Sequence, residues 1–132
     1  MGATRFSEAC LVNKMTDLIK LANVNLNHFP RHEKYGLSQQ IRNTMYDVYN
    51  LIIEGEKRYH KKTSLTELDV KHQQLRMMLK LAYELDYFKY HNGKTDRSQT
   101  ETDRRYLALN LLVNEVGAML GGWIKSESEK MK

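Results

Sequence analysis

Apolar residues recur every three or four positions through four long segments of this chain. That spacing places the apolar side chains on one face of an α-helix. The sequence contains one proline and seven glycines, too few for the frequent turns of a β-sandwich or a β-barrel. We therefore predict an all-α fold with four helices. They cover approximately residues 7–28, 36–59, 64–90 and 100–126.

Local signals mark where these helices begin and end. Pro30 ends the first helix because proline lacks an amide donor and disfavours helix in the residue before it. Ser64 and Glu67 have the spacing of a capping box, in which each side chain satisfies an unpaired amide at the start of a helix. Thr100 or Thr102 is expected to cap the fourth helix in the same manner as Ser64 caps the third.

The three connections between the helices are short and polar. The last of them, residues 91–97, contains an Asn-Gly turn signal. Helices that are joined by short connections pack as antiparallel neighbours. A length of 132 residues suits one domain. We expect a single domain over residues 1–132, folded as an up-down-up-down antiparallel four-helix bundle.

The single cysteine, Cys10, excludes an internal disulfide and any multi-cysteine metal site. One cysteine is compatible with a reducing compartment, and the N-terminal residues MGATRFSEAC lack the pattern of a secretory signal. No continuous run of about 18 apolar residues is present, so the sequence predicts no membrane-spanning helix. We expect a cytoplasmic protein with no membrane partner.

The sequence offers little catalytic chemistry. Di-metal sites in helical bundles need two Glu-x-x-His motifs that face the core, and no glutamate here has a histidine three positions later. Asp69-x-x-His72 is a lone pair that cannot complete such a site. His28 and His32 are separated by Pro30, so we predict loop histidines. No phosphate-binding loop or nucleophile elbow is present. We expect no metal, no other cofactor and no enzymatic activity.

The third and fourth helices carry more apolar residues than one core-facing stripe requires. A second apolar set lies on the third helix away from its core stripe, and apolar residues surround most of the fourth helix. Burying a large apolar side chain contributes about 1.5–3 kcal/mol, so we expect these residues to form the interface of a homo-oligomer. They are Val70, Met77, Leu81 and Phe88 in the third helix and Leu107 and Leu111 in the fourth.

Gly117 and Gly121 form a G-x-x-x-G pattern in the fourth helix. In an apolar membrane span this pattern would suggest dimerisation. In a soluble bundle, small residues allow a neighbouring helix to approach closely. We therefore expect both glycines to mark close helix packing rather than a binding site.

Basic residues exceed acidic ones by 21 to 16, a net charge of +5, which favours a polyanionic partner or an acidic protein surface. Arg76 and Lys80 lie one turn apart on the third helix, on the side of Tyr83 and Tyr87. Arginine and tyrosine together are favoured at interfaces. A solvated helix face is the alternative to a partner- or nucleic-acid-binding site. A second basic cluster adjoins the second connection and consists of Lys57, Arg58, Lys61 and Lys62.

Three stretches resemble a known protein family. Residues 29–42, FPRHEKYGLSQQIR, are similar to the start of helix two in the four-helix-bundle proteins encoded by 23S rRNA intervening sequences. Residues 75–82, LRMMLKLA, resemble the "LRxLLRLA" stretch of helix three. Residues 115–124, EVGAMLGGWI, closely resemble the "EVGRxLGSWI" pattern in the last helix of the accessory variability determinant (Avd) branch of this family. The resemblance extends over approximately residues 8–126.

The resemblance to Avd proteins implies a ring-shaped homopentamer with a positively charged surface. It implies a non-catalytic accessory subunit that binds the reverse transcriptase of a diversity-generating retroelement and its template-repeat RNA or DNA. Such a subunit supports mutagenic retrohoming. The basic positions of helix three, here Arg76 and Lys80, are implicated in this partnership. Lys80 stands where the family usually has arginine, which keeps the charge but lacks the two-pronged geometry.

A second interpretation remains open at the level of the sequence. The intervening-sequence branch shares the bundle and the ring, and the chain would then be a self-assembling structural protein whose partner is unknown. A reverse-transcriptase gene beside a template repeat in the genome would favour the Avd interpretation.

Overall fold

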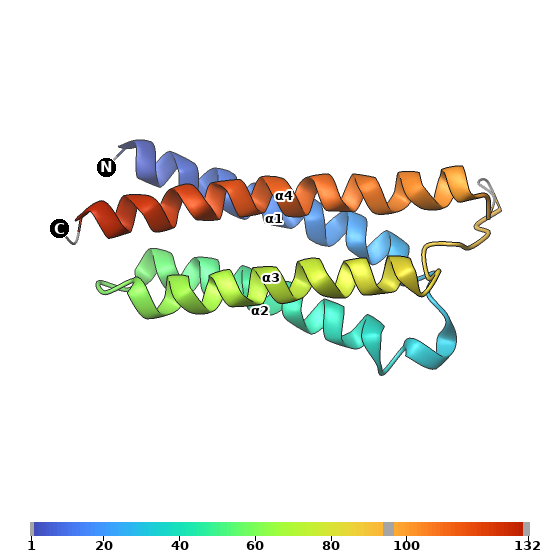
Figure 1. Cartoon of the computed structure of the whole chain (residues 1–132). Helices are drawn as coiled ribbons and strands as arrows, with labels where there is room; N and C mark the ends of the chain where they lie inside the picture. The colour runs from blue at the N-terminus through green and yellow to red at the C-terminus, as the bar shows by residue number, and fades with distance from the viewer. Residues whose placement is uncertain (1, 94–96, 131–132) are drawn as a thin grey trace.

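The computed structural model describes residues 2–93 and 97–130, which contain helices and no β-strands. Four long helices run side by side in alternating directions (Figure 1). The predicted all-α four-helix fold is confirmed. The elements are α1 (Gly2–Leu26), the 3-10 turn η1 (Arg31–Glu33), α2 (Leu37–Lys57), α3 (Lys62–Glu84) and α4 (Gln99–Lys130).

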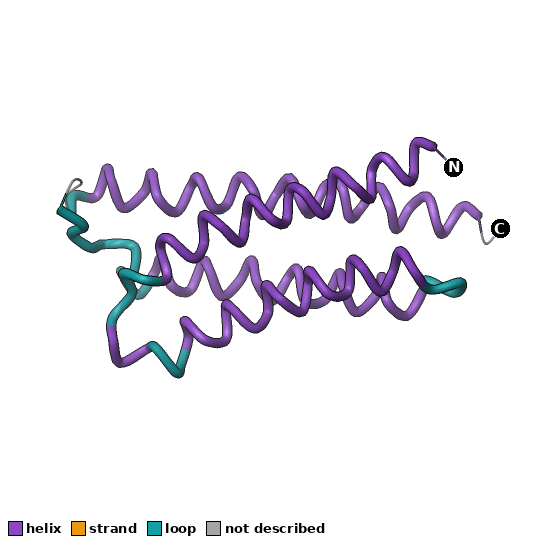
Figure 2. The backbone as a smooth tube through the Cα atoms, turned by 180° about the vertical axis from the view of Figure 1, so that it is seen from behind, coloured by secondary structure: helices purple, strands orange, loops and turns teal. Residues whose placement is uncertain are grey.

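Each helix contributes a stripe of buried apolar side chains to one core. The packing is most extensive between α2 and α3 and between α1 and α4. Both chain ends and the α2–α3 turn lie at one end of the bundle, and the other two connections lie at the opposite end (Figures 1 and 2). The fully buried side chains include Leu11, Met15, Leu18, Ile41, Met45, Ile52, Leu68, Leu75, Leu79, Leu109 and Leu120.

The predicted end of the third helix at residue 90 is wrong, because α3 ends at Glu84. Asp86 adopts a left-handed conformation with φ of 64°. The amide of Asp86 donates to the carbonyl of Tyr83, and the amide of Tyr87 donates to the carbonyl of Ala82, both at 3.0 Å. This pair of bonds is a Schellman motif, which satisfies the last carbonyls of the helix and reverses the chain direction.

This early ending places Phe88 in the core, where its side chain is completely buried. The prediction that Phe88 belongs to an oligomer interface is therefore wrong, because residue 88 no longer follows the helical periodicity of α3. Its ring packs edge-on against Phe29, with centroids 5.3 Å apart, and against Tyr106. The buried guanidinium of Arg105 donates to the carbonyl of Phe88 at 2.8 Å and fixes this segment.

Two of the predicted helix caps are also wrong. Ser64 lies inside α3 and is buried, and its hydroxyl donates to Glu54 Oε2 on α2 at 2.7 Å. At α4 the capping residue is Ser98, whose Oγ accepts a hydrogen bond from the amide of Glu101 at 3.1 Å. Thr102 instead donates its hydroxyl to the carbonyl of Ser98. In both helices the first turn begins before the predicted position, so the expected caps lie within the helix.

The other helix ends differ from the predictions by a few residues. α1 begins five residues before the predicted start, and α4 continues four residues beyond the predicted end. In the last connection, Gly93 has φ of 87°, a conformation that glycine adopts without strain and that fits the Asn-Gly turn signal. Residues 94–96 of that connection lie outside the described residues.

By length and composition alone, α4 is long and apolar enough to cross a membrane, and the expectation that no helix does so stays a prediction. The core helix of a soluble protein has the same composition. α4 directs seven buried residues into the bundle core: Thr102, Arg105, Leu109, Val113, Val116, Leu120 and Trp123.

Candidate partner-binding surface

Arg76 lies on the side of α3 that faces α4, and its side chain is half-buried. Its Nη2 atom would lie 3.1 Å from a Cβ atom added at Gly117, so the guanidinium packs directly on the α4 backbone. The Nε atom is buried and has no hydrogen-bond partner. Over residues 2–93 and 97–130, no carboxylate pairs with this guanidinium either. The positively charged guanidinium of Arg76 therefore lies at the α3–α4 boundary, and its N–H groups have no acceptor within these ranges.

Lys80 lies one turn further along α3 and is exposed to solvent. Its ammonium is 3.9 Å from Glu84 Oε1, in an ion pair whose two side chains are both more than half exposed. Surface pairs of this kind contribute about 0–1 kcal/mol. Lys80 can therefore exchange this neighbour for a partner at little cost. The predicted arrangement of Arg76 and Lys80 on one side of α3 is present, and their role stays a prediction.

Of the two tyrosines predicted beside this pair, only Tyr83 lies on α3. Its hydroxyl donates to Asp103 Oδ1 at 2.6 Å, which raises the pKa of Tyr83 and lowers the pKa of Asp103. Gln99 donates to the same carboxylate oxygen at 2.7 Å. Tyr87 is the last residue of the Schellman motif, beyond the end of α3, and its hydroxyl donates to Glu33 Oε2 at 2.7 Å. Tyr87 therefore stabilises the far end of the bundle and does not extend the Arg76 surface.

His72 lies one turn before Arg76 and is buried between α3 and α4. Its Nε2 atom lies 2.9 Å from the carbonyl oxygen of Val113 on α4. Burial lowers the pKa of His72, and the nearby charge of Arg76 lowers it further. The neutral ring must therefore donate its Nε2 proton to the carbonyl. Within the described part of the chain, no three metal-ligating side chains come together, so the Asp69–His72 pair has no third ligand.

The lowered pKa of His72 predicts a loss of stability on mild acidification. As the pH falls below the ordinary histidine value of 6.5, the unfolded chain takes up a proton that the folded chain resists. The free energy of unfolding is thus expected to fall between pH 7.5 and pH 5.5. In His72→Gln this part of the pH dependence should disappear, as measured by the urea midpoint at the two pH values. An identical slope in the variant would assign the effect to other groups.

The second basic cluster lies at the α2–α3 turn, but only some of its side chains are free of polar contacts within the described part of the chain. Lys61 donates to the carbonyl of Glu56 at 3.1 Å and to that of Gly55, so it caps the end of α2. Arg58 lies 3.4 Å from Glu54 Oε1. Lys57 and Lys62 are exposed. The structure brings the four residues to one turn, with two lysines exposed, Arg58 in a surface pair and Lys61 bonded to α2, and their binding role stays a prediction.

The two basic sets do not form one site. Lys62 and Arg76 are separated by 76 − 62 = 14 residues of α3, which is about 21 Å at 1.5 Å per residue. The α2–α3 turn lies at the end of the bundle that also holds the chain termini (Figure 1), whereas Arg76 lies inside the helix. A partner that contacts both sets must extend along the bundle.

The predicted oligomer residues other than Phe88 point away from the core. Val70, Met77 and Leu81 are 51, 49 and 46% exposed, and Leu107 and Leu111 are each 59% exposed. We call these five residues the outer apolar face. Exposed apolar residues at helical spacing on neighbouring helices are typical of interaction surfaces. Self-association through this face stays a prediction.

Residues 9–127 match the sequence model of the bAvd-like family. The chain belongs to the bAvd-like family. This match confirms the resemblance to Avd-type proteins of diversity-generating retroelements, which are an accessory and non-catalytic kind of protein. No curated protein sequence matches the chain.

In this bAvd-like chain, the closing sequence motif at residues 115–124 joins α4 to the three other helices. Glu115 forms an ion pair of 2.8 Å with Lys14 of α1. Gly117 packs beneath α3, where its missing side chain leaves room for other groups. Trp123 is buried against α2, with Cη2 at 2.8 Å from the position of a Cβ at Gly55. The most specific part of the motif therefore has a structural role in the bundle.

The two glycines of the G-x-x-x-G pattern behave differently. A Cβ at Gly117 would lie 2.8 Å from Cε1 of the buried His72, so the prediction of close packing is confirmed there. Gly121 is exposed, and no atom lies within 4 Å of its Cβ position, so the prediction is wrong for Gly121. In both cases the spacing indicates a shared helix face, but only the tertiary structure shows which glycine a neighbour covers.

These contacts predict opposite effects of alanine at the two positions. We expect Gly117→Ala to lower the free energy of unfolding by about 1–3 kcal/mol, because the new methyl group overpacks the α3–α4 contact. Gly121→Ala should raise it by about 0.5–1 kcal/mol, because alanine favours an exposed helical position over glycine. Urea unfolding of the two variants measures both values. Equal effects of the two substitutions would contradict the close contact at Gly117.

The sequence did not predict the structural settings of Tyr59 and His72. Tyr59 is 92% exposed at the α2–α3 turn, and the aromatic side chain between basic residues was the available signal. For His72 the sequence shows only the Asp69-x-x-His72 spacing, which does not complete a metal site and does not reveal the contact with the α4 backbone.

Proposed function

We propose that this chain is the non-catalytic accessory subunit of a diversity-generating retroelement. It assembles as a cytoplasmic homo-oligomeric ring, by resemblance a pentamer, and binds the reverse transcriptase and the template-repeat RNA or DNA. In this role it supports mutagenic retrohoming. Membership of the bAvd-like family supports the class of function. The structural observation that carries the partner contact is the unmatched guanidinium of Arg76.

An unpaired guanidinium at a helix boundary favours an external acceptor. Leaving a buried donor unsatisfied costs about 1–3 kcal/mol, and the Nε atom of Arg76 is such a donor. A partner at the surface cannot reach this buried atom, so it would pair with the Nη atoms of the same guanidinium. A carboxylate or phosphate group can accept two parallel hydrogen bonds from one guanidinium. Lys80 adds a second positive charge on the same side of α3. An acidic protein surface or a nucleic-acid backbone would satisfy both residues.

The outer apolar face supports the assembly part of the proposal. Stable subunit interfaces resemble a protein core that has been cut in half, and five half-exposed apolar side chains on α3 and α4 fit this description. Assembly also concentrates charge. Five copies at +5 each give 5 × 5 = +25, and a field of that sign attracts nucleic acid from a distance.

The nucleic-acid contact is expected to depend steeply on salt. Each phosphate that a lysine or arginine neutralises releases bound counterions, so six to ten contacts reduce the affinity by about 10³–10⁵ between 50 and 200 mM salt. Fluorescence anisotropy with a labelled RNA measures this dependence. A dissociation constant that is unchanged over that range would contradict electrostatic binding.

A genetic experiment tests the proposed function. In cells that carry the retroelement, deletion of this gene should abolish the transfer of template-repeat sequence into the target gene, and the wild-type gene should restore it. Sequencing of the target gene gives the result. The alternative function, a self-assembling structural bundle of the intervening-sequence type, predicts unchanged transfer. The absence of a reverse-transcriptase gene and a template repeat from the neighbourhood would favour that alternative.

A further inference from the structure

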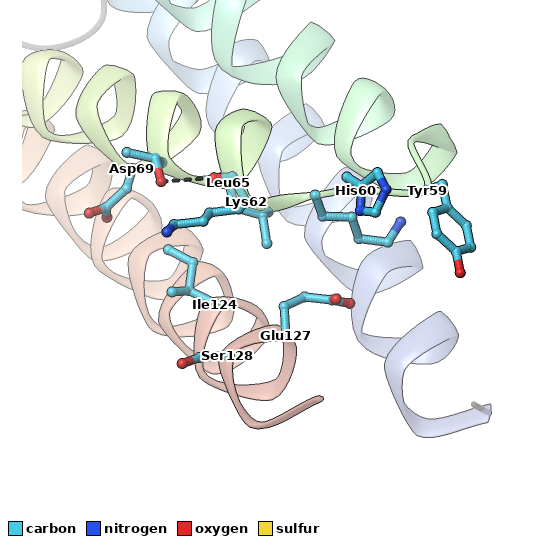
Figure 3. A pocket seen from close by; sticks show the side chains of 10 residues that line it. Tyr59, His60, Lys62, Leu65, Asp69, Ile124, Glu127 and Ser128 are labelled. Atoms are coloured by element: carbon cyan, nitrogen blue, oxygen red, sulfur yellow. Dashed lines mark hydrogen bonds between the residues drawn. The ribbon is translucent and has the colours of Figure 1, made fainter. Parts of the chain in front are cut away.

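The α2–α3 turn borders a cavity of about 460 Å³ at the end of the bundle. One side comes from the turn and the start of α3, and the other comes from the last turns of α4 (Figure 3). Leu65 and Ile124 give the cavity an apolar floor, and Tyr59 and His60 lie on the turn itself. The carboxylates of Asp69 and Glu127 contribute to the walls.

Tyr59 presents an almost fully exposed ring beside this cavity, with 92% of the residue accessible. The ring of His60 lies edge-on to it, with the centroids 4.8 Å apart and the planes at 86°. No other ring contact with Tyr59 occurs in the part of the chain that the structure describes. An aromatic face without a cover is a stacking platform for a flat ligand.

The charges around Tyr59 indicate the kind of ligand. Lys57 and Lys62 flank the turn, both exposed, and neither forms an ion pair with any residue in the described ranges. Lys62 lines the cavity, and Lys57 is the last residue of α2, two positions before Tyr59. Positive charge on both sides of an exposed aromatic residue in the chain fits a phosphate backbone that carries unstacked bases. Asp69 and Glu127 would repel any anionic group inside the cavity, an acidic side chain and a phosphate alike, so the phosphates must lie outside it. A base inside the cavity is compatible with them, because carboxylates accept hydrogen bonds from the amino groups of bases.

We propose that this cavity accepts an unstacked base of single-stranded nucleic acid. The base stacks on Tyr59, and Lys57 and Lys62 hold the adjoining phosphates. A duplex keeps its bases inside the helix and cannot use such a site, so the site selects single strands. This inference rests on the nucleic-acid part of the proposed function and adds the place where the strand is recognised. It is independent of Arg76, which does not line the cavity and follows Asp69, the last lining residue of α3, by seven residues or about 10 Å.

Binding of a labelled twelve-nucleotide RNA to the full chain tests the site, measured by anisotropy at one fixed salt concentration. Tyr59→Ala should weaken binding by about 5- to 150-fold, the effect of losing one stacked base. Tyr59→Phe should bind as the wild type does, because the aromatic face remains. The matched control is Tyr35→Ala: Tyr35 is 78% exposed and also has a basic neighbour, Lys34, but it lies between η1 and α2 at the opposite end. This control should bind with unchanged affinity.

Fluorescence provides a second readout that does not depend on affinity. The single tryptophan of the chain, Trp123, is buried, so Tyr59→Trp introduces an exposed indole with a distinct emission. Single-stranded RNA should quench this emission by stacking, and a duplex of the same sequence should not. Equal quenching by the two forms, or by an acidic peptide, would overturn the proposal.

The outcomes separate this inference from the function on which it rests. Equal affinity of Tyr59→Ala and wild type for the single strand overturns the base site and leaves nucleic-acid binding intact. A wild-type chain that binds neither RNA nor the reverse transcriptase overturns both. Loss of RNA binding in Tyr59→Ala but not in Tyr35→Ala, with co-purification of the reverse transcriptase retained, supports the inference.

Discussion

Replacing Arg76 and Lys80 together with alanine is expected to abolish co-purification of the reverse transcriptase with this chain. Arg76 is half-buried and its guanidinium packs on α4, so the partner supplies an acceptor to Nη atoms that are already positioned. Removing one member of a desolvated charge pair at an interface costs about 2–5 kcal/mol, which corresponds to roughly 30- to 4,000-fold in affinity. Affinity capture of the tagged chain, co-expressed with the enzyme, measures the loss.

The matched control removes the same charge elsewhere. Lys20 on α1 and Lys125 on α4 are both exposed, and Lys20→Ala with Lys125→Ala should retain the enzyme at wild-type yield. Lys80→Arg should maintain or tighten binding, because it adds a planar group with paired donors. The double alanine variant should keep its helicity and its oligomeric mass. If that variant recovers the enzyme at wild-type yield, Arg76 and Lys80 do not bind it and belong to a solvent-exposed helix face.

A second large effect is expected at the outer apolar face. Met77→Glu with Leu81→Glu should reduce the mass in solution to that of one subunit. Each carboxylate would enter an apolar interface without a partner, and an unpaired buried charge costs on the order of several kcal/mol. Both native side chains are about half exposed in the single chain, so the substitutions should not disturb its core. Light scattering at micromolar concentration measures the mass.

Val24→Glu provides the control for this prediction. Val24 is 57% exposed on α1 and lies outside the outer apolar face. Its replacement should leave the oligomeric mass unchanged. If the wild type already has the mass of one subunit, or if the double glutamate variant retains the wild-type mass, assembly through this face is refuted.

Helical periodicity was sufficient to predict the four helices because each one has a long and regular apolar stripe. The buried residues Leu11, Met15 and Leu18 follow this spacing along α1. Periodicity failed where a helix stops without a standard signal. α3 ends at a Schellman motif whose left-handed residue is Asp86 and not glycine. The error at Phe88 follows directly, because its predicted orientation assumed that the helix continued.

The candidate site could be predicted only in part, because the tertiary neighbours of a basic side chain decide whether it can bind a partner. Sequence spacing correctly brought Arg76 and Lys80 to one side of a helix. It could not show that the Arg76 guanidinium lies on the backbone of Gly117 without an acceptor. It also could not show that Lys61 is occupied by the final carbonyls of α2. Four basic residues that look equivalent in the sequence therefore differ in the structure.

Native mass spectrometry of the complex tests the central claim most directly. The chain would be co-expressed with the neighbouring reverse transcriptase and its template-repeat RNA, and then purified through a tag on the chain. The account predicts one assembly that contains several copies of this chain, the enzyme and the RNA. Recovery of this chain alone, as a single subunit without enzyme or RNA, would contradict it.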